Sequence, residues 1–140
     1  LIGDVAKPVR DLVERTERAT MLGIEAVQPG GFLNAVGKAI EAYISPFGYA
    51  IVRDYGGHGI GRQFHEDPHV QHHYSRTNRI RLQPGMIFTI EPMINLGRSP
   101  AVVLSEEDGW TVTTADGSVS AQFEHTVLVT EDGVEILTQV

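Results

Sequence analysis

The chain has 140 residues, which fits one ordinary domain, and 41% of them are hydrophobic, which excludes wholesale disorder. Its formal net charge of −7 argues against a nucleic-acid-binding surface, because such a surface needs a basic patch. The absence of cysteine excludes disulfides and thiolate metal sites and fits a cytoplasmic protein. No signal peptide and no apolar run of about 18 residues are visible, so no membrane partner is expected.

Two amphipathic helices are predicted in the first third of the chain. Apolar side chains recur at three- and four-residue steps over residues 9–27, and Pro8 suits the first turn of that helix. The Pro-Gly-Gly run at 29–31 ends it. A second apolar stripe with the same period covers residues 32–47. The short segment 1–3 is interpreted as the tail of a strand that begins upstream.

The rest of the chain has the alternation and turn residues of β-structure. Residues 62–79 are polar and contain four histidines, so they are predicted to form a long ordered loop. A loop or hairpin is predicted at 95–109. Strands are predicted at 49–52, 86–94 with an interruption at Pro92, 110–113, 120–130 and 134–138. Two helices followed by antiparallel strands predict an α+β fold with the helices on one face of the sheet.

A glycine-rich block, residues 56–61, surrounds His58. It is not a phosphate-binding P-loop, because it lacks the Lys-Ser/Thr pair and no helical pattern follows it. The glycines could bend the backbone so that the His58 imidazole is offered to a ligand. A glycine turn with a bystander histidine explains the same pattern, and spacing leaves both interpretations open.

Two glutamates occupy positions where a carboxylate is unusual. Glu91 ends a strongly apolar strand just before Pro92, where burial of a carboxylate is costly unless the group is paired or metal-bound. Glu124 lies in the middle of a predicted strand. Either side chain could instead face solvent, which periodicity cannot decide. Together with one histidine, two glutamates would suit Mn²⁺, Fe²⁺, Co²⁺ or Zn²⁺.

The other histidines carry a weaker signal. His65 could be a ligand, a hydrogen-bond donor or a structural residue, and taken alone the structural interpretation is favoured. His69, His72 and His73 are interpreted as loop residues, because no helical or strand spacing would bring them together.

Four blocks together resemble the signatures of type I methionine aminopeptidase, in that family's order and near its spacings. They are residues 57–68, 84–93, 108–112 and 120–126. The resemblance implies the pita-bread fold, with residues 1–140 forming the C-terminal half of a single metallopeptidase catalytic domain. In that half, two amphipathic helices pack on a curved antiparallel sheet. Related pita-bread enzymes that cleave X-Pro bonds share the glycine–histidine loop but usually lack the Phe64-His65 pair and the block at 122–125.

The resemblance implies an enzyme that removes the initiator methionine from nascent proteins by hydrolysis, assisted by two divalent metal ions. The ions could be Co, Mn, Fe, Zn or Ni. His58, Glu91 and Glu124 match metal ligands in that family, and Glu124 matches the ligand shared by both ions. Glu91 also matches the family's proton shuttle.

Further roles are implied around the substrate. His65 matches the residue that hydrogen-bonds the scissile amide and stabilises the developing oxyanion. Phe64 and Trp110 match walls of the pocket for the methionine side chain. The implied partner is a peptide or nascent chain that begins with Met, with the ribosome as a further partner. The complete protein is expected to be a cytoplasmic monomer without a specific nucleic-acid ligand.

The family also uses two aspartate ligands, which are expected just upstream of Leu1. The start at Leu1 instead of Met suggests a chain cut from a longer one, and we expect this segment alone to have little or no peptidase activity. A prolidase-like peptidase is one alternative. A pita-bread binding module without catalysis is another, although such modules usually lose their ligands and every ligand position covered here is intact.

Overall fold

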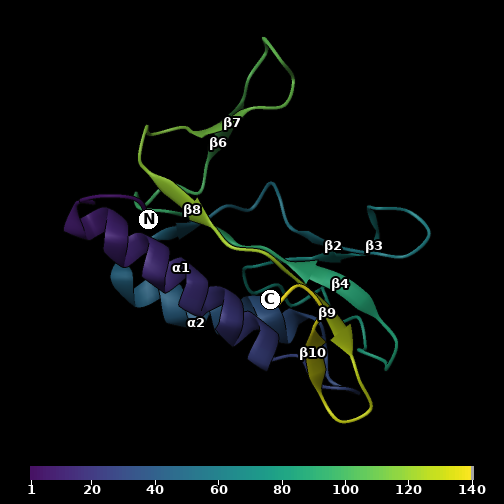
Figure 1. The fold of residues 1–140 in the computed structure, drawn as a ribbon. Helices are drawn as coiled ribbons and strands as arrows, with labels where there is room; N and C mark the ends of the chain where they lie inside the picture. The colour runs from purple at the N-terminus through teal and green to yellow at the C-terminus, as the bar shows by residue number, and fades with distance from the viewer. Residues whose placement is uncertain (140) are drawn as a thin grey trace.

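The computed structural model describes residues 1–139, so Val140, the last residue of the predicted half-domain, lies outside the described residues. Helices α1 (Lys7–Glu25) and α2 (Asn34–Ile44) lie side by side along one side of the strands (Figure 1). A short 3₁₀ helix, η1 (Ser45–Phe47), follows α2. No helix within residues 1–139 is both long enough and apolar enough to cross a membrane.

The strands form three antiparallel sheets. Their bounds are β1 (Ala50–Ile51), β2 (Gly57–Gly59), β3 (Glu66–Val70), β4 (Ile87–Ile90), β5 (Met93–Asn95), β6 (Val102–Leu104), β7 (Val112–Thr114), β8 (Ser120–Gln122), β9 (His125–Val129) and β10 (Val134–Ile136). The largest sheet has the order β10-β9-β4-β2-β3, and a smaller one has the order β1-β5-β8. The third is the β6–β7 hairpin, which projects from the body of the molecule (Figure 1).

The predicted helices are confirmed, and their apolar stripes form the core. A proline lies in the first turn of α1, where its missing N–H costs no hydrogen bond. Gly23 lets α1 approach α2, because a Cβ at that position would lie 2.9 Å from the Ile40 side chain. The core joins both helices to the large sheet through Leu12, Ile24, Val36, Ile40, Phe88, Ile90 and Val127. Burial of each such side chain stabilises the fold by about 1.5–3 kcal/mol.

The predicted α+β architecture is therefore found, with both helices on one face of antiparallel strands. The predicted interruption at Pro92 is also found, because β4 ends before it and β5 begins after it. The segment predicted as a loop or hairpin at 95–109 supplies β6, which pairs with β7.

The prediction of one long strand over residues 120–130 is wrong. β8 pairs with β5 in the small sheet, while β9 pairs with β4 in the large sheet. The two-residue gap between β8 and β9 faces the gap between β4 and β5, since Ile90 pairs with His125 and Met93 pairs with Gln122. Pro92 has no N–H to donate to a ladder, and the strand pairing resumes in the same register after it.

Two further predictions are corrected. The segment 62–79 is not a continuous loop, because it contains β3, which pairs with β2. β3 is an edge strand with mostly exposed polar side chains, so no apolar alternation marked it in the sequence. Residues 1–3 form no strand in the described structure, and the Ile2 side chain is almost fully exposed.

Candidate metal centre

Three side chains from distant parts of the sequence meet at the gap between the two sheets. His58 comes from β2, Glu91 follows β4, and Glu124 lies between β8 and β9. One possible ligand atom from each residue lies within 4.8 Å of the other two. His58 and Glu91 are half-buried, while Glu124 is exposed. Strand register accounts for the meeting of the two glutamates, because Ile90 pairs with His125 and Met93 pairs with Gln122, which places Glu91 opposite Glu124.

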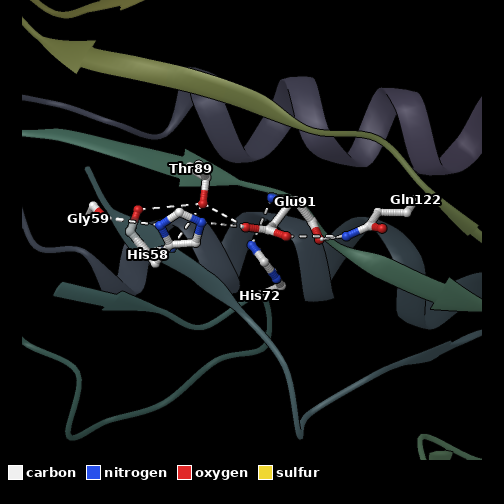
Figure 2. Close-up of polar contacts among 6 residues, drawn as sticks. All are labelled: His58, Gly59, His72, Thr89, Glu91 and Gln122. Carbon is white, nitrogen blue, oxygen red and sulfur yellow. Dashed lines mark hydrogen bonds and ion pairs between the residues drawn. The ribbon is translucent and has the colours of Figure 1, made fainter. Parts of the chain in front are cut away.

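The backbone around His58 fixes the direction of its imidazole. Nδ1 of His58 lies 3.0 Å from the carbonyl oxygen of Gly59, which can only accept a hydrogen bond, so Nδ1 is the donor. Nε2 is then the nitrogen with a free lone pair, and it lies 3.7 Å from Oε1 of Glu91 (Figure 2). Gly57 allows β2 to approach β4 closely, since a Cβ there would collide with the carbonyl oxygen of Thr89.

The Glu91 carboxylate is held at both oxygens. The Thr89 hydroxyl donates a hydrogen bond of 2.7 Å to Oε1, and Nε2 of Gln122 lies 3.3 Å from Oε2 (Figure 2). Burial raises the pKa of Glu91 above its ordinary value, the Thr89 hydrogen bond lowers it, and the nearby negative charge of Glu124 raises it again. A cation beside both carboxylates would relieve this repulsion.

His72 adds a contact that sequence reasoning missed. It lies in a loop after β3, as predicted, but its side chain is only 2% exposed. Its Nε2 accepts a hydrogen bond of 3.0 Å from the backbone N–H of Glu91 (Figure 2). Burial lowers the pKa of His72 to about 3, and His69 and His73 add to this effect, so the imidazole is neutral at pH 7. The contact between His72 and Glu91 depends on where β3 lies in the sheet, and the sequence showed no apolar alternation that would have predicted β3.

The two aromatic residues after the glycine block lie at the rim of the site. The ring centroid of His65 is 4.2 Å from that of His58, and the Phe64 ring is 5.6 Å from His58. Phe64 is 71% exposed. His65 is also exposed, so its imidazole is free to meet a ligand that approaches His58 from solvent.

Trp110 is not gathered with these residues. It lies in the connection between β6 and β7, and it is 84% exposed. The β6–β7 hairpin projects from the body of the molecule (Figure 1). Within residues 1–139, no aromatic pair joins Trp110 to Phe64.

The donor set fits a divalent metal ion. One imidazole nitrogen with a free lone pair and two carboxylates are ligands that Mn²⁺, Fe²⁺, Co²⁺ and Zn²⁺ accept. The supporting contacts also match such a site, because a ligating histidine usually donates its other nitrogen to a carbonyl, and a ligating carboxylate is usually hydrogen-bonded. His69 and His73 do not join the group of possible ligands among the described residues.

Comparison with known proteins agrees with this chemistry. The profile of metallopeptidase family M24 matches residues 1–131. A protein named methionine aminopeptidase A from Synechocystis is 51% identical over 137 residues, which are 98% of this chain and 53% of that protein. The crystal structure of methionine aminopeptidase from Rickettsia prowazekii is 50% identical, with a TM-score of 0.93 over 98% of this chain and 55% of that one.

More distant pita-bread structures share the fold. Prolidase from Pyrococcus furiosus is 26% identical, with a TM-score of 0.72, and the match covers all of this chain and 35% of that one. The chain spans about half the length of the curated relatives it matches.

Proposed function

We propose that this chain, which belongs to metallopeptidase family M24, forms the C-terminal half of the catalytic domain of a type I methionine aminopeptidase. The observation that carries this proposal is the meeting of His58, Glu91 and Glu124 within 4.8 Å in a chain about half identical to proteins of that name. The complete enzyme would remove the initiator methionine from nascent proteins by hydrolysis.

His58, Glu91 and Glu124 would hold the metal in this half of the site. Divalent ions at such sites polarise the scissile carbonyl and lower the pKa of water. The ligands present here suit Co, Mn, Fe, Zn or Ni, and a second ion would take further ligands from the part of the relatives that this chain does not span. Glu124, the most exposed of the three, is our candidate for the ligand shared by both ions.

Two side chains of this chain would move protons and stabilise charge. Glu91 is half-buried and lies beside both Glu124 and His58, which places it where a carboxylate could take a proton from water and pass it to the leaving amine. His65 lies beside His58 and is exposed toward solvent, where it can donate a hydrogen bond to the scissile amide. A donor aimed at the developing oxyanion is commonly worth about 3–4 kcal/mol of barrier.

Substrate selection would use the apolar side chains at the rim. Phe64 and Trp110 are exposed aromatic side chains, and an apolar aromatic wall suits the thioether of a substrate methionine. The proposed partner is a peptide or nascent chain that begins with Met. The complete enzyme would act on it as a monomer in the cytoplasm, near the ribosome.

The prolidase-like alternative is less well supported. Identity falls from 50% for the Rickettsia methionine aminopeptidase to 26% for the Pyrococcus prolidase, and the TM-score falls from 0.93 to 0.72. A non-catalytic binding module is also disfavoured, because all three predicted ligands are present and close together.

A chimera tests the activity. This chain would replace the matching segment of the Rickettsia enzyme, which it overlays with a TM-score of 0.93. We expect the Mn²⁺- or Co²⁺-loaded chimera to cleave Met-Ala-Ser and not Ala-Pro peptides, and His65→Ala to lower turnover by about 100-fold or more. A folded, metal-loaded chimera without Met-Ala-Ser cleavage, or one that prefers Ala-Pro, would overturn the proposal.

A further inference from the structure

One hydroxyl group contacts both of the half-buried ligand residues. The Oγ1 atom of Thr89 accepts a hydrogen bond of 2.9 Å from the backbone N–H of His58. The same oxygen donates its proton to Oε1 of Glu91 at 2.7 Å. Figure 2 shows the Thr89 oxygen between the other two residues. Thr89 is 1% exposed, so water does not compete for either contact.

The direction of these two hydrogen bonds is fixed by chemistry. A backbone N–H can only donate, so the Thr89 oxygen must accept from His58. The hydroxyl has a single proton, and the nearest acceptor is Glu91, since the carbonyl oxygen of His58 is 3.5 Å away. The chain of contacts therefore runs from the His58 amide through the Thr89 hydroxyl to the Glu91 carboxylate.

The fold is built to allow this contact. Thr89 and Glu91 are two residues apart, so their side chains share one side of the strand. Gly57, next to His58, has no Cβ that would hold β2 away from Thr89. His58 and Glu91 share no direct side-chain hydrogen bond, since Nε2 of His58 is 3.7 Å from Oε1 of Glu91, so Thr89 is the link between them.

We propose that Thr89 is a positioning residue, which fixes the Glu91 carboxylate relative to the β2 backbone that carries His58. This inference rests on the proposed function, since it assigns His58 and Glu91 to a metal ion. Partners that orient metal ligands in this way typically change metal affinity by about 10–100-fold when they are removed. Thr89 would act through its hydroxyl and not through its volume.

Two variants separate the hydroxyl from the volume. Thr89→Val keeps the shape of the side chain and removes the hydroxyl, while Thr89→Ser keeps the hydroxyl and removes a methyl group. Thr126→Val is the matched control, because Thr126 pairs with Thr89 across the β4–β9 ladder and its hydroxyl makes no hydrogen bond among the described residues. Each variant is checked for folding by circular dichroism, and Thr89→Ala replaces Thr89→Val if the latter does not fold.

Mn²⁺ affinity is measured by calorimetry on the 140-residue chain. We expect Thr89→Val to weaken binding by about 10–100-fold, and Thr89→Ser and Thr126→Val to stay within about threefold of the unmodified chain. Unchanged affinity in Thr89→Val would overturn the proposal. Equal losses in Thr89→Val and Thr89→Ser would also overturn it, because they would indicate packing.

A metal-free measurement keeps this test separate from the proposed function. Amide hydrogen exchange at His58 should be about tenfold faster in Thr89→Val than in Thr89→Ser, because only the latter keeps an acceptor for that N–H. If the unmodified chain binds no Mn²⁺, its three ligands do not form a metal site without the rest of the enzyme, and the exchange rates alone decide the role of Thr89. Equal exchange in all variants would refute it.

Discussion

The backbone N–H of Glu91 donates a hydrogen bond of 3.0 Å to Nε2 of His72, nineteen residues earlier in the chain. The donated proton requires a bare nitrogen, so the contact exists only while His72 is neutral. This hydrogen bond connects the loop after β3 to Glu91, the residue that follows the end of β4. The same backbone unit is held on its other side, where Nε2 of Gln122 lies 3.2 Å from the Glu91 carbonyl oxygen.

This contact predicts acid sensitivity. The pKa of His72 is about 3 in the folded chain and about 6.5 when the chain is unfolded, so the unfolded state takes up the proton first as pH falls. The stability that neutral His72 contributes is therefore complete above pH 6.5 and is lost between about pH 6.5 and 3. The loss approaches about 1.4 kcal/mol per pH unit in that window.

Urea unfolding at pH 7, 5 and 4 measures this slope. His72→Asn removes the titrating group and should flatten the pH dependence relative to the unmodified chain. His125→Asn is the control, because His125 lies on β9 and is not among the groups that shift the pKa of His72. Identical slopes in the unmodified chain and in His72→Asn would contradict the prediction.

Replacement of Gly37 by alanine is expected to destabilise the folded chain. In an exposed helix, glycine-to-alanine replacement usually stabilises by up to about 1 kcal/mol. Gly37 lies in α2, but a Cβ there would collide with the carbonyl oxygens of Gln71 and His73, which flank His72. We expect Gly37→Ala to lower the free energy of unfolding by about 1–3 kcal/mol.

The measurement is the melting temperature of Gly37→Ala, compared with that of Gly133→Ala and of the unmodified chain. A Cβ at Gly133 meets no atom within 4 Å, so that variant should unfold near the temperature of the unmodified chain. A melting temperature for Gly37→Ala at or above that of the unmodified chain would show that the loop around His72 is not packed against α2.

Metal should stabilise the folded chain through Glu124. A ligand that binds only the folded state at 100 times its Kd adds about 2.7 kcal/mol of stability. We expect Mn²⁺ to raise the melting temperature of the unmodified chain and Glu124→Gln to abolish most of this rise. Glu135→Gln, at an exposed position of β10, should keep it.

Without metal, Glu124→Gln should not destabilise the chain. The Glu124 carboxylate is exposed, and its charge raises the pKa of Glu91, so its removal relieves repulsion. A metal-dependent rise that survives in Glu124→Gln would exclude Glu124 as a ligand.

The isolated 140-residue chain should have little or no peptidase activity. It spans about half the length of the curated relatives, and its possible metal ligands form one group of three among the described residues. The measurement is turnover of Met-Ala-Ser with added Mn²⁺ or Co²⁺ beside the full-length Rickettsia enzyme. Turnover near that of the full-length enzyme would refute the expectation.

The helices show how far periodicity reaches. The apolar stripes of residues 9–27 and 32–47 predicted α1 and α2, because a helix is held by local hydrogen bonds and its buried face repeats every turn. The interruption at Pro92 was also predictable, since proline cannot donate to a ladder.

The sequence by itself determined the helices, the fold class, the family resemblance and the candidate donors His58, Glu91 and Glu124. Only the tertiary structure decided that the strand at 120–130 breaks opposite Pro92 and that the strand register places Glu91 opposite Glu124. It also decided that His72 is buried against Glu91 and that Thr89 links Glu91 to His58. The physical reason is that strand pairing joins residues far apart in the chain, so a strand's own alternation cannot tell where its partner bends or which polar side chains the partner covers.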